Sequence, residues 1–126
     1  MDVQLSNKVI DWNQLMDRGF DEEIVMNVVP ICIDDNRERL PLLSEAIDNN
    51  DSDRVRLYAH SFKGSAANIG ALNLSAAAGL LEDAAEQHDL SDAGRLFTKI
   101  EAEFARLEQF VSSPDWIDKL KSGRCE

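Results

Sequence analysis

"SDAGRLFTKIEAEFARLEQFV", residues 91–111, places apolar side chains three or four positions apart over its whole length. Such spacing puts the apolar side chains on one face of an α-helix and the charged side chains on the other. The segment therefore predicts a long amphipathic helix that needs neighbours to cover its apolar face. The residues on that face are Ala93, Leu96, Phe97, Ile100, Phe104, Leu107 and Val111.

Helical spacing continues outward from this segment towards the N-terminus. It predicts helices over residues 72–88, from residue 51 or 52 to about residue 70, and over residues 35–48. The polar stretch "DNNDSD" at residues 48–53 is the clearest turn. No run of residues shows the alternation typical of a half-buried strand. Short connections between successive amphipathic helices favour antiparallel neighbours, so the sequence predicts an α-helical bundle.

Two prolines complicate the first part of the chain. Asp21 is a plausible N-cap for a helix that continues past Val28, and Pro30 lies inside that helix. A proline in a helix interior removes a backbone hydrogen bond, so we expect Pro30 to kink or break the helix. Pro41 interrupts the next one in the same way, and a short helix is expected over residues 11–18.

Composition and charge limit the possible functions. The 126 residues, 44% of them hydrophobic and 29% charged, fit one globular domain. A net charge of −11 argues against binding to nucleic acid or to anionic membranes, both of which attract basic proteins. The N-terminus lacks the apolar core of a signal peptide, and the uncharged stretch 64–81 is rich in alanine and interrupted by glycine, asparagine and serine, so we expect a cytoplasmic protein. Cys32 is expected to be a buried small hydrophobe and Cys125 a free thiol in the tail.

"YAHSFKGSAANIG", residues 58–70, contains a histidine on the exposed side of its predicted helix. On a helical wheel His60 lies about 160° from the buried position of Phe62, nearly opposite the core. Its neighbours on that side include Gly64 and Ala67, where an ordinary exposed helix would carry long polar side chains. A glycine within a helix costs about 1 kcal/mol relative to alanine. Small residues beside an exposed imidazole therefore indicate a place where another protein comes close.

A lysine completes this arrangement, because the charge of Lys63 lies one turn from His60 and is suited to hold an anion. The motif "AHSFKGSAANIGA", residues 59–71, resembles that of histidine-containing phosphotransfer (HPt) domains. In that family a histidine is followed by lysine three, glycine four and a second glycine ten residues later. All these positions are met here, by His60, Lys63, Gly64 and Gly70.

The resemblance covers roughly residues 8–112 and implies the fold. HPt domains are all-α proteins, antiparallel four-helix bundles with short additional N-terminal helices. We therefore expect an HPt-like bundle over residues 8–112, and a C-terminal tail or short helix over residues 113–126.

The resemblance also implies roles for individual residues. His60 would accept a phosphoryl group from a receiver-domain aspartate or a sensor kinase and pass it to another response regulator. Lys63 would stabilise the phosphate, and Glu82 would hydrogen-bond the His60 ring. A carboxylate that accepts a hydrogen bond from Nδ1–H fixes the tautomer that leaves Nε2 free to attack, which independently fits that role. An ordinary exposed carboxylate on the helix surface is the alternative for Glu82.

The partners follow from the same resemblance. We expect response-regulator receiver domains and a hybrid sensor kinase as partners, with Mg²⁺ supplied by the receiver and no cofactor or metal bound to this chain. The sequence contains no P-loop or kinase motif, so the protein is expected to be a monomeric phosphocarrier and not an enzyme. Met1 and the length favour a free-standing protein. The expected docking surface comprises Gly64, Ala67, Asn68 and either Leu72 or Leu74, with Arg56 on its rim.

Three alternative functions make different demands on the sequence. A helical adaptor would bind receivers without phosphotransfer, and altering His60 would then leave its effects intact. A di-iron bundle requires Glu-x-x-His pairs, but Leu57 and Ala85 stand three residues before His60 and His88. A hydrolase would need a nucleophile elbow that the sequence lacks.

Overall fold

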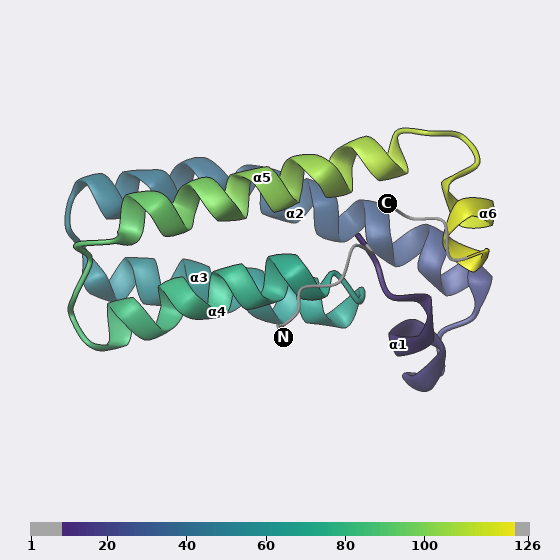
Figure 1. Cartoon of the computed structure of the whole chain (residues 1–126), viewed down its shortest axis with the longest axis horizontal. Helices are drawn as coiled ribbons and strands as arrows, with labels where there is room; N and C mark the ends of the chain where they lie inside the picture. Colours follow the sequence, from purple (N-terminus) through teal and green to yellow (C-terminus); the bar gives the residue numbers. More distant parts are fainter. Residues whose placement is uncertain (1–8, 123–126) are drawn as a thin grey trace, which may run out of the picture.

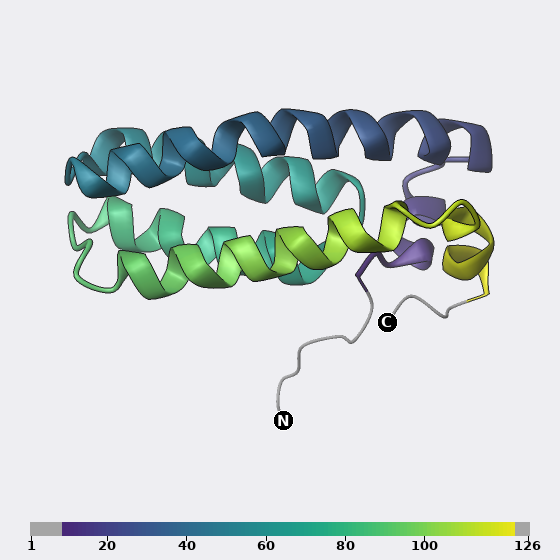
Figure 2. The ribbon, with the colours of Figure 1, turned by 90° about the horizontal axis from the view of Figure 1, so that it is seen from above.

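Four long helices lie side by side and alternate in direction in the computed structural model, which describes residues 9–122 (Figure 1). The turned view shows them as two layers, with α2 above α5 and with α3 and α4 behind them (Figure 2). The expectation of an antiparallel four-helix bundle is therefore confirmed. The six helices of the described residues are α1 (Trp12–Asp17), α2 (Glu22–Asp48), α3 (Ser52–Asn68), α4 (Leu72–Glu86), α5 (Ala93–Val111) and α6 (Trp116–Lys121).

The two helices expected before the motif are a single helix, α2. Of the two outcomes predicted at Pro30, a kink or a break, the break is therefore wrong. Both Pro30 and Pro41 are exposed. At such positions water can bond to the carbonyl oxygens that lose their helical partner. Val25, Val29 and Ile33 are buried on either side of Pro30, and this shared packing holds the helix in one piece. Packing thus outweighs the local effect of the prolines.

The core forms where the helices meet. Phe62 of α3 is fully buried and packs edge to face against Phe104 of α5, with ring centroids 6.4 Å apart. Five of the eleven buried residues of α3 and α4 are alanines, whose small side chains allow the two helices to approach closely. The buried alanines of this pair are Ala59 and Ala66 on α3 and Ala77, Ala78 and Ala85 on α4.

The turn between α3 and α4 needs a glycine. Gly70 has a φ of +73°, which side chains rarely adopt, and a Cβ there would lie 2.8 Å from the backbone oxygen of Asp11. The Asp11 N–H also donates to the Gly70 carbonyl at 2.8 Å. The segment before α1 is thereby fixed against the end of the motif helix.

Both short helices lie at the end of the bundle where α2 and α5 extend beyond α3 and α4 (Figures 1 and 2). The segment expected as a tail or short helix contains α6, whose Ile117 and Leu120 are buried. The boundary at residue 112 stays a prediction. Cys32 is only half-buried, and Cys125 lies outside the described residues. Between residues 9 and 122, none of the helices combines the length and the apolar character needed to cross a membrane.

Candidate functional site

His60 lies in the middle of α3 on the side away from the core. Its side chain is 63% exposed, whereas Phe62, two residues later, is completely buried. The ring nitrogen Nδ1 lies 2.8 Å from Oε2 of Glu82 on α4. One nitrogen of the imidazole is thus held by the neighbouring helix, and Nε2 is the nitrogen left for chemistry.

Glu82 connects two residues of the motif, His60 and Lys63. The Glu82 residue is only 7% exposed, so the alternative of an ordinary exposed carboxylate is wrong. Its Oε2 faces His60, and its Oε1 lies 2.6 Å from the Nζ of Lys63. A single carboxylate from α4 therefore bridges an imidazole and an ammonium from α3.

The charges of this cluster support one another. The hydrogen bond from Lys63, and to a lesser degree that from His60, lowers the pKa of the Glu82 carboxyl although burial raises it. The same bond raises the pKa of the Lys63 ammonium. Glu82 is therefore an anion at neutral pH, able to accept a hydrogen bond from Nδ1–H of a neutral imidazole. In that tautomer Nε2 carries a free lone pair.

The residues predicted to bind a partner lie on α3 with different exposures. Gly64 is exposed, and a Cβ added there would meet no atom within 4 Å, so packing inside the chain does not require a glycine. Arg56 and Asn68 are exposed as well, and Ala67 is half-buried. Asn68 accepts a hydrogen bond from Arg18 Nη1 at 3.4 Å.

The predicted surface needs one correction beyond α3. Leu74 is only 2% exposed because it packs into the core, so it does not belong to the surface, whereas Leu72 is half-buried. Two exposed leucines close to the motif were not predicted to belong to this surface. Leu57, one turn before His60, is 54% exposed, and Leu42 on α2 is 45% exposed. Both line a pocket between α2 and α3 together with Asp35, Glu38, Arg39, Tyr58 and Ser61.

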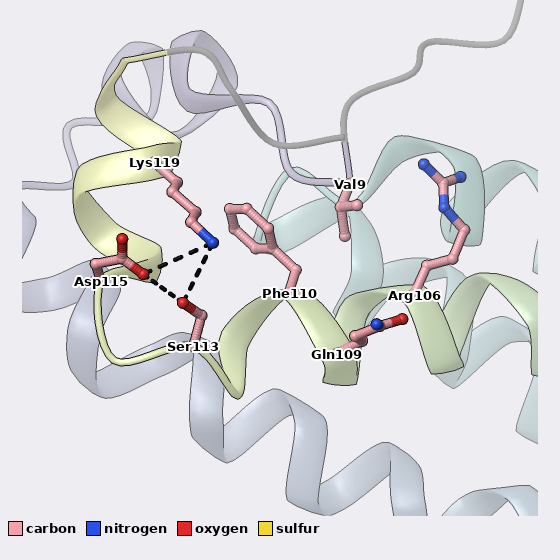
Figure 3. A pocket seen from close by; sticks show the side chains of 7 residues that line it. All are labelled: Val9, Arg106, Gln109, Phe110, Ser113, Asp115 and Lys119. Carbon is pink, nitrogen blue, oxygen red and sulfur yellow. Dashed lines mark hydrogen bonds and ion pairs between the residues drawn. The ribbon is translucent and has the colours of Figure 1, made fainter.

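Another pocket lies at the end of the bundle that carries α6, and its lining includes no residue of α3 or α4 (Figure 3). Lys119 points into it, and its Nζ is within 3.7 Å of Asp115 and 3.3 Å of Ser113. Its other lining residues are Val9, Arg106, Gln109 and Phe110. The described part of the chain contains no cluster of three or more His, Cys, Asp or Glu residues suited to hold a metal.

The chain is similar to known proteins in both sequence and fold. Residues 27–110 match the family model described as the Hpt domain. The crystal structure of histidine-containing phosphotransfer protein B (HptB) from Pseudomonas aeruginosa PAO1 is similar to this chain, with a TM-score of 0.72 and 28% sequence identity. The superposition covers 94% of this chain and 96% of that one. No curated protein gives a significant sequence match.

Proposed function

The chain belongs to the Hpt domain family, whose members are phosphotransfer intermediates of two-component phosphorelays, and from this premise we propose that His60 carries the phosphoryl group. The contact between His60 Nδ1 and Glu82 Oε2, 2.8 Å long, is the observation that supports this assignment best. It directs Nε2 away from Glu82 on a ring that a partner can reach.

The reaction follows from that orientation. The Nε2 lone pair attacks the phosphorus of an aspartyl phosphate on a receiver domain, or of a phosphohistidine on a sensor kinase. A P–N bond forms to His60 as the bond to the donor breaks, and the donor leaves with that electron pair. The imidazole becomes positively charged, and its Nδ1–H is stabilised by the Glu82 anion. Attack by a receiver aspartate on the same phosphorus reverses these steps.

Lys63 contributes the second charge. Its ammonium, paired with Glu82 at 2.6 Å, lies on the same carboxylate as the His60 ring. It can therefore reach the oxygens of a phosphoryl group on that ring and stabilise the charge that they carry. Mg²⁺ belongs to the acidic pocket of the receiver, so this chain acts as a phosphocarrier that meets its metal only in the complex.

The receiver docks over the exposed side of α3. Gly64 and Ala67 provide a surface of small residues beside His60, with Arg56 and Asn68 near it, and Leu57 and Leu42 extend that surface with apolar contacts towards α2. Asp35 and Glu38 line the same pocket, and the whole chain carries a net charge of −11. A receiver surface that is apolar at its centre and basic at its rim would therefore complement this side of α3.

Transfer of labelled phosphate from pre-phosphorylated receiver domains, in the presence of Mg²⁺, tests the function. We expect rapid labelling of the wild type, no labelling of His60→Gln, and a product that is labile in acid and stable in alkali. His88→Gln is the matched control because it removes the other histidine of the chain, and it should be labelled normally.

The same experiment separates phosphotransfer from the adaptor function. A panel of receivers that leaves the wild type unlabelled, with one receiver binding equally to wild type and His60→Gln, would show an adaptor. Labelling of His60→Gln at the wild-type rate would show that another residue is the acceptor.

A further inference from the structure

Three residues of α4, spaced about one turn apart, face successive parts of Lys63. The Ser75 hydroxyl donates to the backbone carbonyl of Lys63 at 3.0 Å. A Cβ added at Gly79 would lie 3.4 Å from Cδ of Lys63, and Oε1 of Glu82 lies 2.6 Å from its Nζ. The backbone carbonyl and the ammonium of Lys63 therefore each have a partner on α4, and the stem between them passes beside Gly79.

Gly79 has no backbone reason to be glycine. It lies inside α4 without a positive φ, where glycine is the least favourable residue after proline. The atom that an added Cβ would approach is the stem of Lys63. A side chain longer than that of alanine at position 79 would therefore compete for space with the stem of Lys63 on its way to Glu82.

We propose that Gly79 is a positioning residue for phosphoryl transfer, because it keeps open the space in which Lys63 extends to the carboxylate that also holds His60. This inference rests on the function proposed above and adds a residue that contacts neither the phosphoryl group nor its acceptor. The Lys63 side chain is 42% exposed, so an unrestrained lysine would sample many rotamers. The ion pair with Glu82, which the open space beside Gly79 permits, restrains the lysine before the reaction begins.

The geometry sets a size limit at position 79. An alanine Cβ at 3.4 Å is in ordinary van der Waals contact, so Gly79→Ala should be tolerated. The longer side chain of Gly79→Leu would occupy the space of the lysine stem and displace the ammonium from Glu82. Gly94→Leu is the matched control, because Gly94 is an exposed helical glycine whose added Cβ meets nothing within 4 Å.

Phosphoramidate, a small phosphoryl donor that needs no docking surface, separates chemistry from receiver binding. We expect Gly79→Leu to slow the labelling of His60 about tenfold, as misplacement of a catalytic group does, Gly79→Ala to slow it less, and Gly94→Leu to stay within about twofold of the wild type. In a Lys63→Ala background, Gly79→Leu should have no further effect. Titration of the Lys63 Nζ by NMR should show its pKa closer to the ordinary value in Gly79→Leu only.

Two outcomes would overturn the inference. One is an unchanged rate and an unchanged lysine titration in Gly79→Leu. The other is an equal loss of rate with and without Lys63, which would show that Gly79 acts by another route. A wild type labelled by neither phosphoramidate nor any receiver would instead contradict the proposed function. The lysine titration would still test the contact between Gly79 and Lys63.

Discussion

Replacement of Glu82 by glutamine should slow phosphoryl transfer while leaving the bundle folded. Glutamine has the volume of glutamate but one carbonyl oxygen, whereas both carboxylate oxygens of Glu82 are used, by His60 at 2.8 Å and by Lys63 at 2.6 Å. The variant also lacks the anion that faces the imidazole as it becomes positive. Glu82→Gln therefore removes an interaction that grows during the reaction.

The size of the effect follows from the burial of the two groups. Unit charges about 4 Å apart attract each other by about 1 kcal/mol in water and about 4 kcal/mol near a protein surface. The Glu82 side chain is 9% exposed but that of His60 is 63% exposed, and only part of the imidazole charge has developed in the transition state. About 1–2 kcal/mol remains, which corresponds to a rate about 5- to 30-fold lower.

Labelling by phosphoramidate measures this rate without a receiver, and thermal unfolding checks the fold. Glu103→Gln is the matched control, because its carboxylate is 16% exposed and pairs with Arg106 at 3.1 Å on α5, away from His60. We expect that variant to react at the wild-type rate. A Glu82→Gln rate within twofold of the wild type, with His60→Gln unlabelled, would refute the electrostatic role of Glu82.

Three further predictions concern stability. Gly70→Ala should lower the free energy of unfolding by about 2 kcal/mol in urea titrations, because alanine is strained at a positive φ and its Cβ would collide with Asp11; an unchanged midpoint would contradict the tight turn. Pro30→Ala should raise the free energy of unfolding by about 1–3 kcal/mol by restoring a helical hydrogen bond, and a decrease would show that the proline is needed. The pKa of Glu82 is lowered from 4.5 in the folded state, so its stabilising contribution is fully present above that pH and disappears as the pH falls through the folded value. The stability difference between wild type and Glu82→Gln, followed from pH 7 to pH 3, should therefore shrink in acid, and a constant difference would mean that the pair with Lys63 contributes nothing.

Helical period was a reliable guide to the fold because burial on one face is a property of the sequence itself. The stripe predicted for residues 91–111 is the buried face of α5, with Leu96, Ile100 and Phe104 in the core. Near Pro30 the rule that a proline kinks or breaks a helix led to the prediction of two helices where the structure has one. Buried contacts on both sides of a proline depend on distant helices, and the order of residues along one helix does not reveal them.

In the candidate site, too, positions within one helix could be predicted and contacts between helices could not. The wheel places His60 on the exposed side of its helix because that position depends only on neighbours in α3. The contact with Glu82, 22 residues away, depends on how closely α3 and α4 approach, and only the family resemblance indicated it before the structure did. Leu57 and Leu42 were missed because leucines are assigned to the core by default. The same wheel puts Leu57 on the exposed side, about 60° from His60, and this signal could have been used.

An imidazole on an open helix surface differs from one in a cleft in how long it can keep a phosphoryl group. Glu82 contacts the His60 ring at Nδ1, so a phosphoryl group on Nε2 would face bulk water. Glu82 would not be placed to orient a water molecule for attack on that group. Its lifetime would then be set by the intrinsic reactivity of the P–N bond. Discharge would wait for an encounter with a receiver that brings the metal and the accepting carboxylate. On the proposed function the bundle would supply one half of an active site, and the concentration of the receiver that carries the other half would set the rate of the relay.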